Sequence, residues 1–159
     1  MDNVNVIRTG FFAPDFSLPD TKGNIFKLNE NLEDSFIALS FFSGVDDNRA
    51  KSVLKSLNSG LPKTAAGLNV KIVGISSDKV QQLEKLRYDL NLGFPLLSDS
   101  RLSVTRRYYV DNSDSIKPAP YLSIFVIDDE GIVRHRISEI PSVSEFSFET
   151  FKEDIAKLI

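Results

Sequence analysis

The strongest constraint on the fold of this chain is a run of apolar residues in its first third. Residues 36–42 read Phe-Ile-Ala-Leu-Ser-Phe-Phe, the composition of a strand that is covered on both faces of a sheet. A second such run, residues 70–76, follows a segment in which apolar residues recur at helical spacing. Buried strands that alternate with amphipathic helices predict an α/β fold with a central mixed sheet flanked by helices.

Turn signals and hydrophobic periodicity predict the remaining elements. Asp46 and Asp47 are candidate caps at the start of the first helix, and Gly60 and Pro62 end it. In chain order we expect an N-terminal β-hairpin over residues 11–28, a first helix with Ala50, Val53, Leu54 and Leu57 on its apolar face, a second helix with Val80, Leu83, Leu86 and Leu90, a short strand at 94–99 leading into a helix that ends near Tyr108, a loop at 111–120, a hairpin over 121–137 and a helix with Phe148, Phe151, Ile155 and Leu158.

Length and composition narrow the class of protein further. A chain of 159 residues with 42% hydrophobic content suits a single domain over residues 1–159 that buries about 70% of its unfolded surface. The net charge of −3 comes from charges spread along the chain, which argues against nucleic acid as a partner. Residues 1–8 lack the features of a secretory signal, and the apolar runs are too short to cross a membrane. We therefore expect a cytoplasmic protein with no membrane contact.

Several segments carry a likeness to a known family, and they occur in the family's order over residues 10–138. The chain resembles peroxiredoxins of the alkyl hydroperoxide reductase/thiol-specific antioxidant (AhpC/TSA) type. The resemblance implies a thioredoxin-like fold that is preceded by a β-hairpin. The matching segments are Ala13-Pro14-Asp15-Phe16-Ser17-Leu18-Pro19-Asp20 with Gly23, Val73-Gly74-Ile75-Ser76-Ser77-Asp78, Phe94-Pro95-Leu96-Leu97-Ser98-Asp99, and Phe125-Val126-Ile127-Asp128 with Gly131.

The resemblance fails at the catalytic positions. Peroxiredoxins carry a Pro-x-x-x-Thr-x-x-Cys loop at the start of the first core helix, and alignment without a gap puts Ser43, Asp47 and Ala50 at its three defining positions. The family's arginine, which precedes the penultimate strand, falls at Leu122. The chain contains no cysteine at all, so no thiol mechanism is available to it.

The four replacements are linked by chemistry. A peroxidatic thiol needs a pKa lowered by a helix N-terminus and a cation, and the arginine and hydroxyl also hold the peroxide. Here the nucleophile is a methyl group, the cation is an aliphatic chain, and the hydroxyl is a carboxylate that disfavours a neighbouring thiolate. We therefore expect no catalytic residue and no cofactor at the positions Ser43, Asp47, Ala50 and Leu122.

Other candidate sites have simpler structural explanations. Asp46 and Asp47 could hold a divalent cation, but carboxylates at a helix start more often accept backbone N–H groups, so we expect no metal. His135, the only histidine, is interpreted as a structural residue on the more apolar face of its strand. Phe11 and Phe12 are adjacent, and one of them could belong to an interface.

Serines and arginines also suggest sites. No Gly-x-Ser-x-Gly motif surrounds any serine of the candidate strand ends, so local hydrogen bonding is the better interpretation. The basic residues of the helix before Tyr108 are interpreted as a solvated helix face. The serines in question are Ser40, Ser43, Ser76, Ser77 and Ser98, and the basic residues are Arg101, Arg106 and Arg107.

Three functions remain open from the sequence. The favoured hypothesis is a non-enzymatic binding or structural subunit. The resemblance also suggests a homodimer, because peroxiredoxins commonly form dimers. The alternatives are an enzyme of another chemistry in the vacated pocket, and a partner of a redox complex whose cysteine comes from another polypeptide. Converging titratable groups in one cleft would favour an enzyme, whereas a filled site and an exposed apolar patch would favour a binding subunit.

Overall fold

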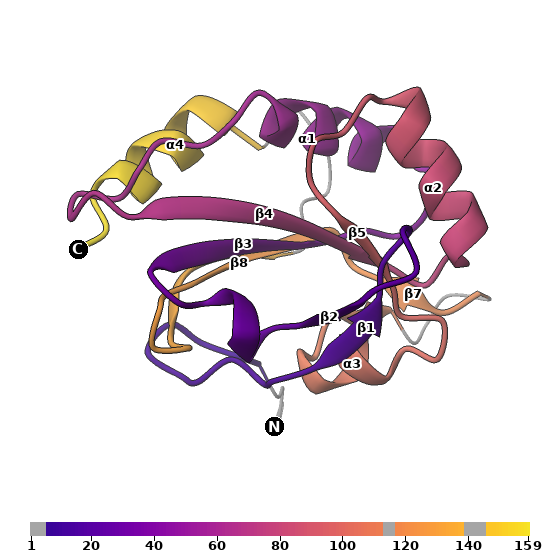
Figure 1. The fold of residues 1–159 in the computed structure, drawn as a ribbon, viewed down its shortest axis with the longest axis horizontal. Coiled ribbons are helices and arrows are strands. Elements are labelled where there is room, and N and C mark those ends of the chain that lie inside the picture. Colours follow the sequence, from indigo (N-terminus) through magenta and orange to yellow (C-terminus); the bar gives the residue numbers. More distant parts are fainter. Residues whose placement is uncertain (1–5, 113–116, 139–145) are drawn as a thin grey trace, which may run out of the picture.

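A computed structural model describes residues 6–112, 117–138 and 146–159 of the chain. Its centre is a five-stranded mixed sheet in the order β5-β4-β3-β8-β9 (Figure 1). The β3–β4 and β4–β5 pairs are parallel, whereas the β3–β8 and β8–β9 pairs are antiparallel. The bounds of these strands are β3 Ser35–Phe41, β4 Asn69–Ser76, β5 Leu96–Ser98, β8 Ser123–Ile127 and β9 Val133–Ile137.

The apolar run in the first third of the chain forms the middle strand, β3. All seven residues of β3 are buried, and β3 pairs with β4 on one edge and β8 on the other. Its alternate side chains therefore point into two separate clusters, with Phe36 and Ala38 on one face and Ile37 and Leu39 on the other. The predicted buried strand is confirmed.

Helices and the hairpin cover the two faces of the sheet (Figure 1). One face packs against three helices, whose apolar residues form the first cluster. The other face is covered by the N-terminal hairpin, a 3₁₀ turn and a short helix. The helices of the first face are α1 Asn48–Asn58, α2 Val80–Asp89 and α4 Phe148–Ala156; the elements of the second are β1 Ser17–Pro19, β2 Ile25–Lys27, the turn Asn29–Asn31 and α3 Ser103–Arg107.

An aromatic cluster fixes the N-terminal segment to the second face. The ring of Tyr108 lies 5.3 Å from the rings of both Phe41 and Phe125, and 6.2 Å from that of Phe16. Burial raises the pKa of Tyr108, and its hydroxyl donates a hydrogen bond of 2.6 Å to the carbonyl of Pro14. The buried hydroxyl is thus satisfied by the segment that leads into β1.

The predicted elements are confirmed with small changes in their bounds. The apolar face of α1 is fully buried, whereas the predicted face of α2 is buried only at Leu83 and Leu86. The expected loop at 111–120 is partly wrong, because β6 Asp111–Asn112 pairs with β7 Ala119–Pro120. A ladder of two residues has no apolar alternation that a sequence pattern could reveal.

Some expectations fall outside the described residues. These are the N-terminal residues 1–5 and positions 113–116 of the expected loop. Within the described residues, no helix combines the length and the hydrophobicity needed to cross a bilayer.

Replacing Tyr108 by phenylalanine tests the role of the aromatic cluster. Tyr108→Phe keeps the ring but leaves the Pro14 carbonyl without its donor, so we expect the free energy of unfolding to fall by about 0.5–1.5 kcal/mol. Tyr109→Phe is the matched control, because Tyr109 is 47% exposed, and its effect should stay within about 0.5 kcal/mol. Urea denaturation measures both, and equal losses in the two variants would contradict this account.

Candidate functional site

The candidate site lies where β3 ends and the chain turns into α1. Residues 42–47 form this connection. Leu122 lies at the same end of the sheet, because its neighbour Ser123 is paired with Phe41 at the end of β3. The fold therefore brings together the four positions that the family likeness singled out, two on the connection, one in α1 and one just before β8.

Asp47 caps the first helix. Its Oδ1 accepts the backbone N–H of Arg49 at 2.9 Å and that of Ala50 at 3.3 Å, and its Oδ2 accepts the hydroxyl of Ser43 at 2.5 Å. Of the two aspartates predicted as caps, the structure selects Asp47, while Asp46 is exposed. A carboxylate of the chain itself thus lies at the positive end of the helix dipole.

The two positions that the family likeness assigns to the cysteine and the arginine are packed. Ala50 is fully buried and Leu122 is 4% exposed, and both belong to the apolar cluster between the sheet and α1. A methyl group and an isobutyl group in such a cluster offer no polar atom to a ligand. This part of the site is filled by the core of the protein.

The environment of Asp47 keeps its carboxyl ionised. Partial burial acts to raise the pKa, but hydrogen bonds from Ser43, Ala50 and Arg49, together with the charge of Arg49, outweigh burial. The pKa of Asp47 is consequently lowered from its ordinary value of 3.8. A carboxylate with a lowered pKa is a poor general acid or base near neutral pH, whereas it is well suited to a structural role.

A second carboxylate, Asp78, holds the connection in place, a role that was not predicted from the sequence. Its Oδ2 accepts the backbone N–H of Val45 at 3.0 Å and the hydroxyl of Ser76 at 2.7 Å. Ser98 donates a hydrogen bond of 2.6 Å to the Asp78 carbonyl. The signal in the sequence is a Ser-x-Asp motif directly after a buried strand, a pattern that favours local side-chain hydrogen bonds.

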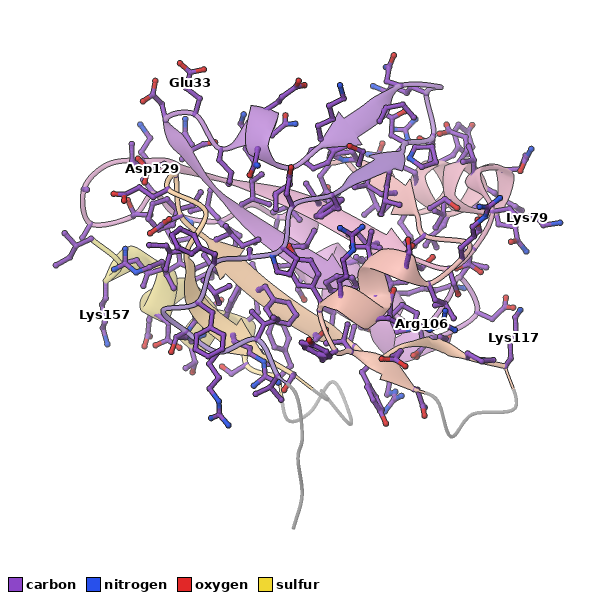
Figure 2. All side chains as sticks on the ribbon, turned by 90° about the horizontal axis from the view of Figure 1, so that it is seen from below. Glu33, Lys79, Arg106, Lys117, Asp129 and Lys157 are labelled. Carbon is purple, nitrogen blue, oxygen red and sulfur yellow. The ribbon has the colours of Figure 1, made fainter. Side chains whose placement is uncertain are left out.

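A polar cleft lies beside the packed positions. It encloses about 600 Å³ and is lined by the connection, the start of α2 and the approach to β7. Charged groups at its edge include Asp46, Asp78, Lys79 and Lys117. Figure 2 shows Lys79 and Lys117 projecting outward on the same side of the molecule. Two of the carboxylates that line the cleft, Asp47 and Asp78, already accept hydrogen bonds from the chain itself.

The other candidate residues lie away from this site. His135 Nε2 is 3.6 Å from Asp154 Oδ2, and its ring lies 5.8 Å from that of Phe151, so it packs against α4 as a partly covered residue. Arg107 is exposed and donates a hydrogen bond to the carbonyl of Asp15. Local hydrogen bonding explains Ser43, Ser76 and Ser98 but not Ser40, whose buried hydroxyl has no partner among the described residues.

Fold and sequence together assign the chain to a family. The central sheet with helices on its faces defines a thioredoxin-like α/β protein, as in the solved structures that resemble it. Residues 9–136 match the AhpC/TSA family. The chain therefore belongs to the AhpC/TSA family.

Individual relatives agree with this assignment. Peroxiredoxin Bcp of Escherichia coli is 27% identical over 146 residues, which cover 83% of this chain and 86% of the relative. A putative peroxiredoxin of Mycobacterium tuberculosis is 30% identical over 145 residues, covering 90% of each. The crystal structure of peroxidoxin BcpB from M. tuberculosis superposes with a TM-score of 0.79 at 29% identity, covering 94% of this chain and 95% of the other.

The fold extends to more distant proteins. The crystal structure of a peroxiredoxin-like protein from Aquifex aeolicus has a TM-score of 0.82 at 18% identity, covering 98% of this chain and 90% of the other. This likeness concerns the fold alone.

Replacement of the capping carboxylate tests the role of Asp47. Asp47→Ala should lower the free energy of unfolding by about 0.5–2 kcal/mol at pH 7, and the exposed Asp46→Ala provides the matched control. Because folding lowers the pKa of Asp47, its stabilising effect is complete above the ordinary value of 3.8 and is lost as the pH falls below it. Urea denaturation should therefore show a smaller difference between wild type and Asp47→Ala at about pH 3 than at about pH 7.

Two results would contradict the cap. One is an equal loss of stability in Asp46→Ala. The other is a melting temperature that Mg²⁺ raises and EDTA lowers in the wild type but not in Asp47→Ala, because it would point to a bound cation instead.

Proposed function

We propose that this AhpC/TSA-family chain lacks peroxidase activity and acts as a non-enzymatic binding or structural subunit. The observation that carries the proposal is the position of Asp47. Its carboxylate accepts the N–H groups of Arg49 and Ala50 at the helix start, where the family likeness implies that a peroxide would bind next to the thiol. Ser43, Asp47, Ala50 and Leu122 are the remnants of the catalytic positions in this proposal.

Chemical requirements support this view. Reduction of a peroxide needs a thiolate to attack one oxygen, and the chain has no cysteine. It also needs positive charge where the O–O bond breaks, but Leu122 is aliphatic and buried. The negative charge of Asp47 opposes the formation of an anion nearby. Each change alone impairs the reaction, and together they remove its nucleophile and its electrostatic stabilisation.

The proposal includes a single domain over residues 1–159, a cytoplasmic location and a homodimer. Phe11 and Phe12 support the homodimer, because they are 50% and 74% exposed and large exposed apolar side chains favour interfaces.

A second candidate function is an enzyme of another chemistry, and the polar cleft is the observation in its favour. Lys79, Lys117 and Asp46 border a volume of about 600 Å³, which is large enough for a small charged substrate. The packed state of Ala50 and the internal bonds of Asp47 weigh against it, because they leave no activated nucleophile in the described part of the cleft. A role beside a thiol-bearing partner in a redox complex is the third possibility.

Peroxidase assays test the proposal directly. The purified chain should consume neither hydrogen peroxide nor an organic hydroperoxide above the buffer rate, with thioredoxin or dithiothreitol as reductant. The reason is the missing thiol together with the aliphatic Leu122. Turnover clearly above buffer, in a preparation free of contaminating peroxidase, would overturn the proposal.

Reintroducing the nucleophile tests the surroundings of the site. Ala50→Cys should react with peroxide no faster than Ser52→Cys, an exposed cysteine in the same helix, because burial and the charge of Asp47 both raise the thiol pKa. Adding Asp47→Thr and then Leu122→Arg should lower that pKa stepwise, although an unpaired buried arginine costs stability.

The measurement is the rate of peroxide oxidation against pH for each variant, with circular dichroism to verify folding. If Ala50→Cys alone reacts much faster than Ser52→Cys, the catalytic surroundings are intact and the proposal is wrong.

A further inference from the structure

The sheet has an unpaired edge in the first half of β4. The short strand β5 pairs only with residues Gly74 to Ser76, and the last bond on this side joins the Gly74 N–H to the Pro95 carbonyl at 3.0 Å. N–H and C=O groups alternate in direction along a strand, so those of Ile72 and Val70 point the same way as those of Gly74. In the described part of the chain, no strand or loop pairs with them.

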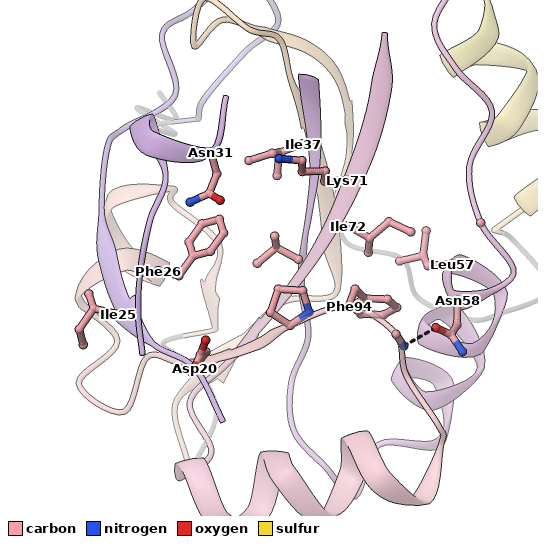
Figure 3. Close-up of a pocket in the computed structure, with 14 residues that line it drawn as sticks. Asp20, Ile25, Phe26, Asn31, Ile37, Leu57, Asn58, Lys71, Ile72 and Phe94 are labelled. Carbon is pink, nitrogen blue, oxygen red and sulfur yellow. Dashed lines mark hydrogen bonds between the residues drawn. The ribbon is translucent and has the colours of Figure 1, made fainter. Parts of the chain in front are cut away.

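This free edge forms the floor of a groove of about 620 Å³. Figure 3 shows Phe26 and Asn31 on one side of β4, and Leu57, Ile72 and Phe94 on the other. The groove thus runs between the N-terminal hairpin and the C-terminal end of α1. An added strand sends alternate side chains to opposite faces of a sheet, and here an apolar wall is present on each face.

The walls of the groove are held by hydrogen bonds. The Asn58 side chain accepts the Gly93 N–H at 2.8 Å and donates to the Asn91 carbonyl at 2.9 Å. This pair joins the end of α1 to the segment that carries Phe94 (Figure 3). On the opposite wall, Ile25 of the hairpin is 58% exposed at the rim of the groove. The groove is therefore preformed and partly apolar.

Two charged residues line the groove, Asp20 and Lys71. The Asp20 carboxylate already accepts the backbone N–H groups of Lys22 and Asn24, so Lys71 selects the kind of occupant. Lys71 is an exposed residue of β4 that lines the groove, and Figure 3 shows its side chain on the same side of β4 as Asn31. No ion pair in the described structure involves Lys71. Antiparallel pairing of two copies about residue 71 would bring two lysines together, and like charges directly opposite each other destabilise a sheet.

We propose that this groove binds an extended peptide segment of a partner protein, added as a strand to the free edge of β4. The N–H and C=O groups of Val70 and Ile72 bind its backbone, and the apolar walls receive alternate apolar side chains. Lys71 pairs with an acidic side chain of the peptide. The groove lies at the opposite end of α1 from Asp47, so this binding is independent of the fate of the peroxidase site.

Selection from a displayed library of random 12-residue peptides tests the proposal. We expect enriched peptides to alternate apolar residues and to carry aspartate or glutamate. Synthetic copies of these peptides, titrated by fluorescence anisotropy, should bind Lys71→Glu about three- to tenfold more weakly than wild type. Lys157→Glu is the matched control, because Lys157 is exposed in α4's C-terminal turn and the variant makes the same change of charge elsewhere.

Amide hydrogen exchange, measured by NMR with and without peptide, tests the proposal on the wild-type chain and needs no variant. A bound peptide should slow the exchange of the Val70 and Ile72 amides, which point to the free edge. Failure to enrich any peptide, enriched peptides that leave these two amides unprotected, or equal weakening by Lys157→Glu would each overturn the proposal. Protection that rises with protein concentration in the absence of peptide would also overturn it, because a second copy would then occupy the edge.

Discussion

Burial of β3 on both faces is the constraint on which the rest of the structure depends. All seven residues pair with β4, the five from Ile37 to Phe41 also pair with β8, and an apolar cluster lies on each face. Neither layer can therefore shift without disturbing the other. The end of this strand also fixes where the connection to α1 begins. The candidate site is therefore positioned by the most deeply buried element of the protein, although the chain has no cysteine to place there.

The two ends of α1 have different characters. At its N-terminus, Asp47 and Asp78 satisfy backbone and hydroxyl donors with carboxylates of the chain itself, and Ala50 is fully buried. At its C-terminus, Asn58 supports a wall of the groove beside unpaired strand groups. Internal satisfaction of polar groups favours a static structure, while unsatisfied edge groups favour association. The proposed binding of a peptide thus has a physical basis at the end of the helix away from Asp47.

The sequence predicted the sheet, the main helices and the cap of α1 because these depend on local patterns. The apolar run at 36–42, the helical spacing from Ala50 and the paired aspartates each express their structure within a few residues. Three other features depend on segments that are distant in the sequence. They are the pairing of β6 with β7, the hydrogen bond from the Val45 N–H to Asp78, and the edge of β4 that β5 leaves unpaired. Periodicity carries no information about which edge of a strand remains unpaired, so only the three-dimensional structure reveals the groove.

The cap at Asp47 has a consequence for any dissolved anion that approaches the helix. The carboxylate is tethered two and three residues from the N–H groups it binds, so its effective concentration there far exceeds that of a free ligand. An external anion would have to displace this built-in competitor and leave its negative charge nearby. The N–H groups at this helix end are therefore already occupied by a carboxylate of the chain itself.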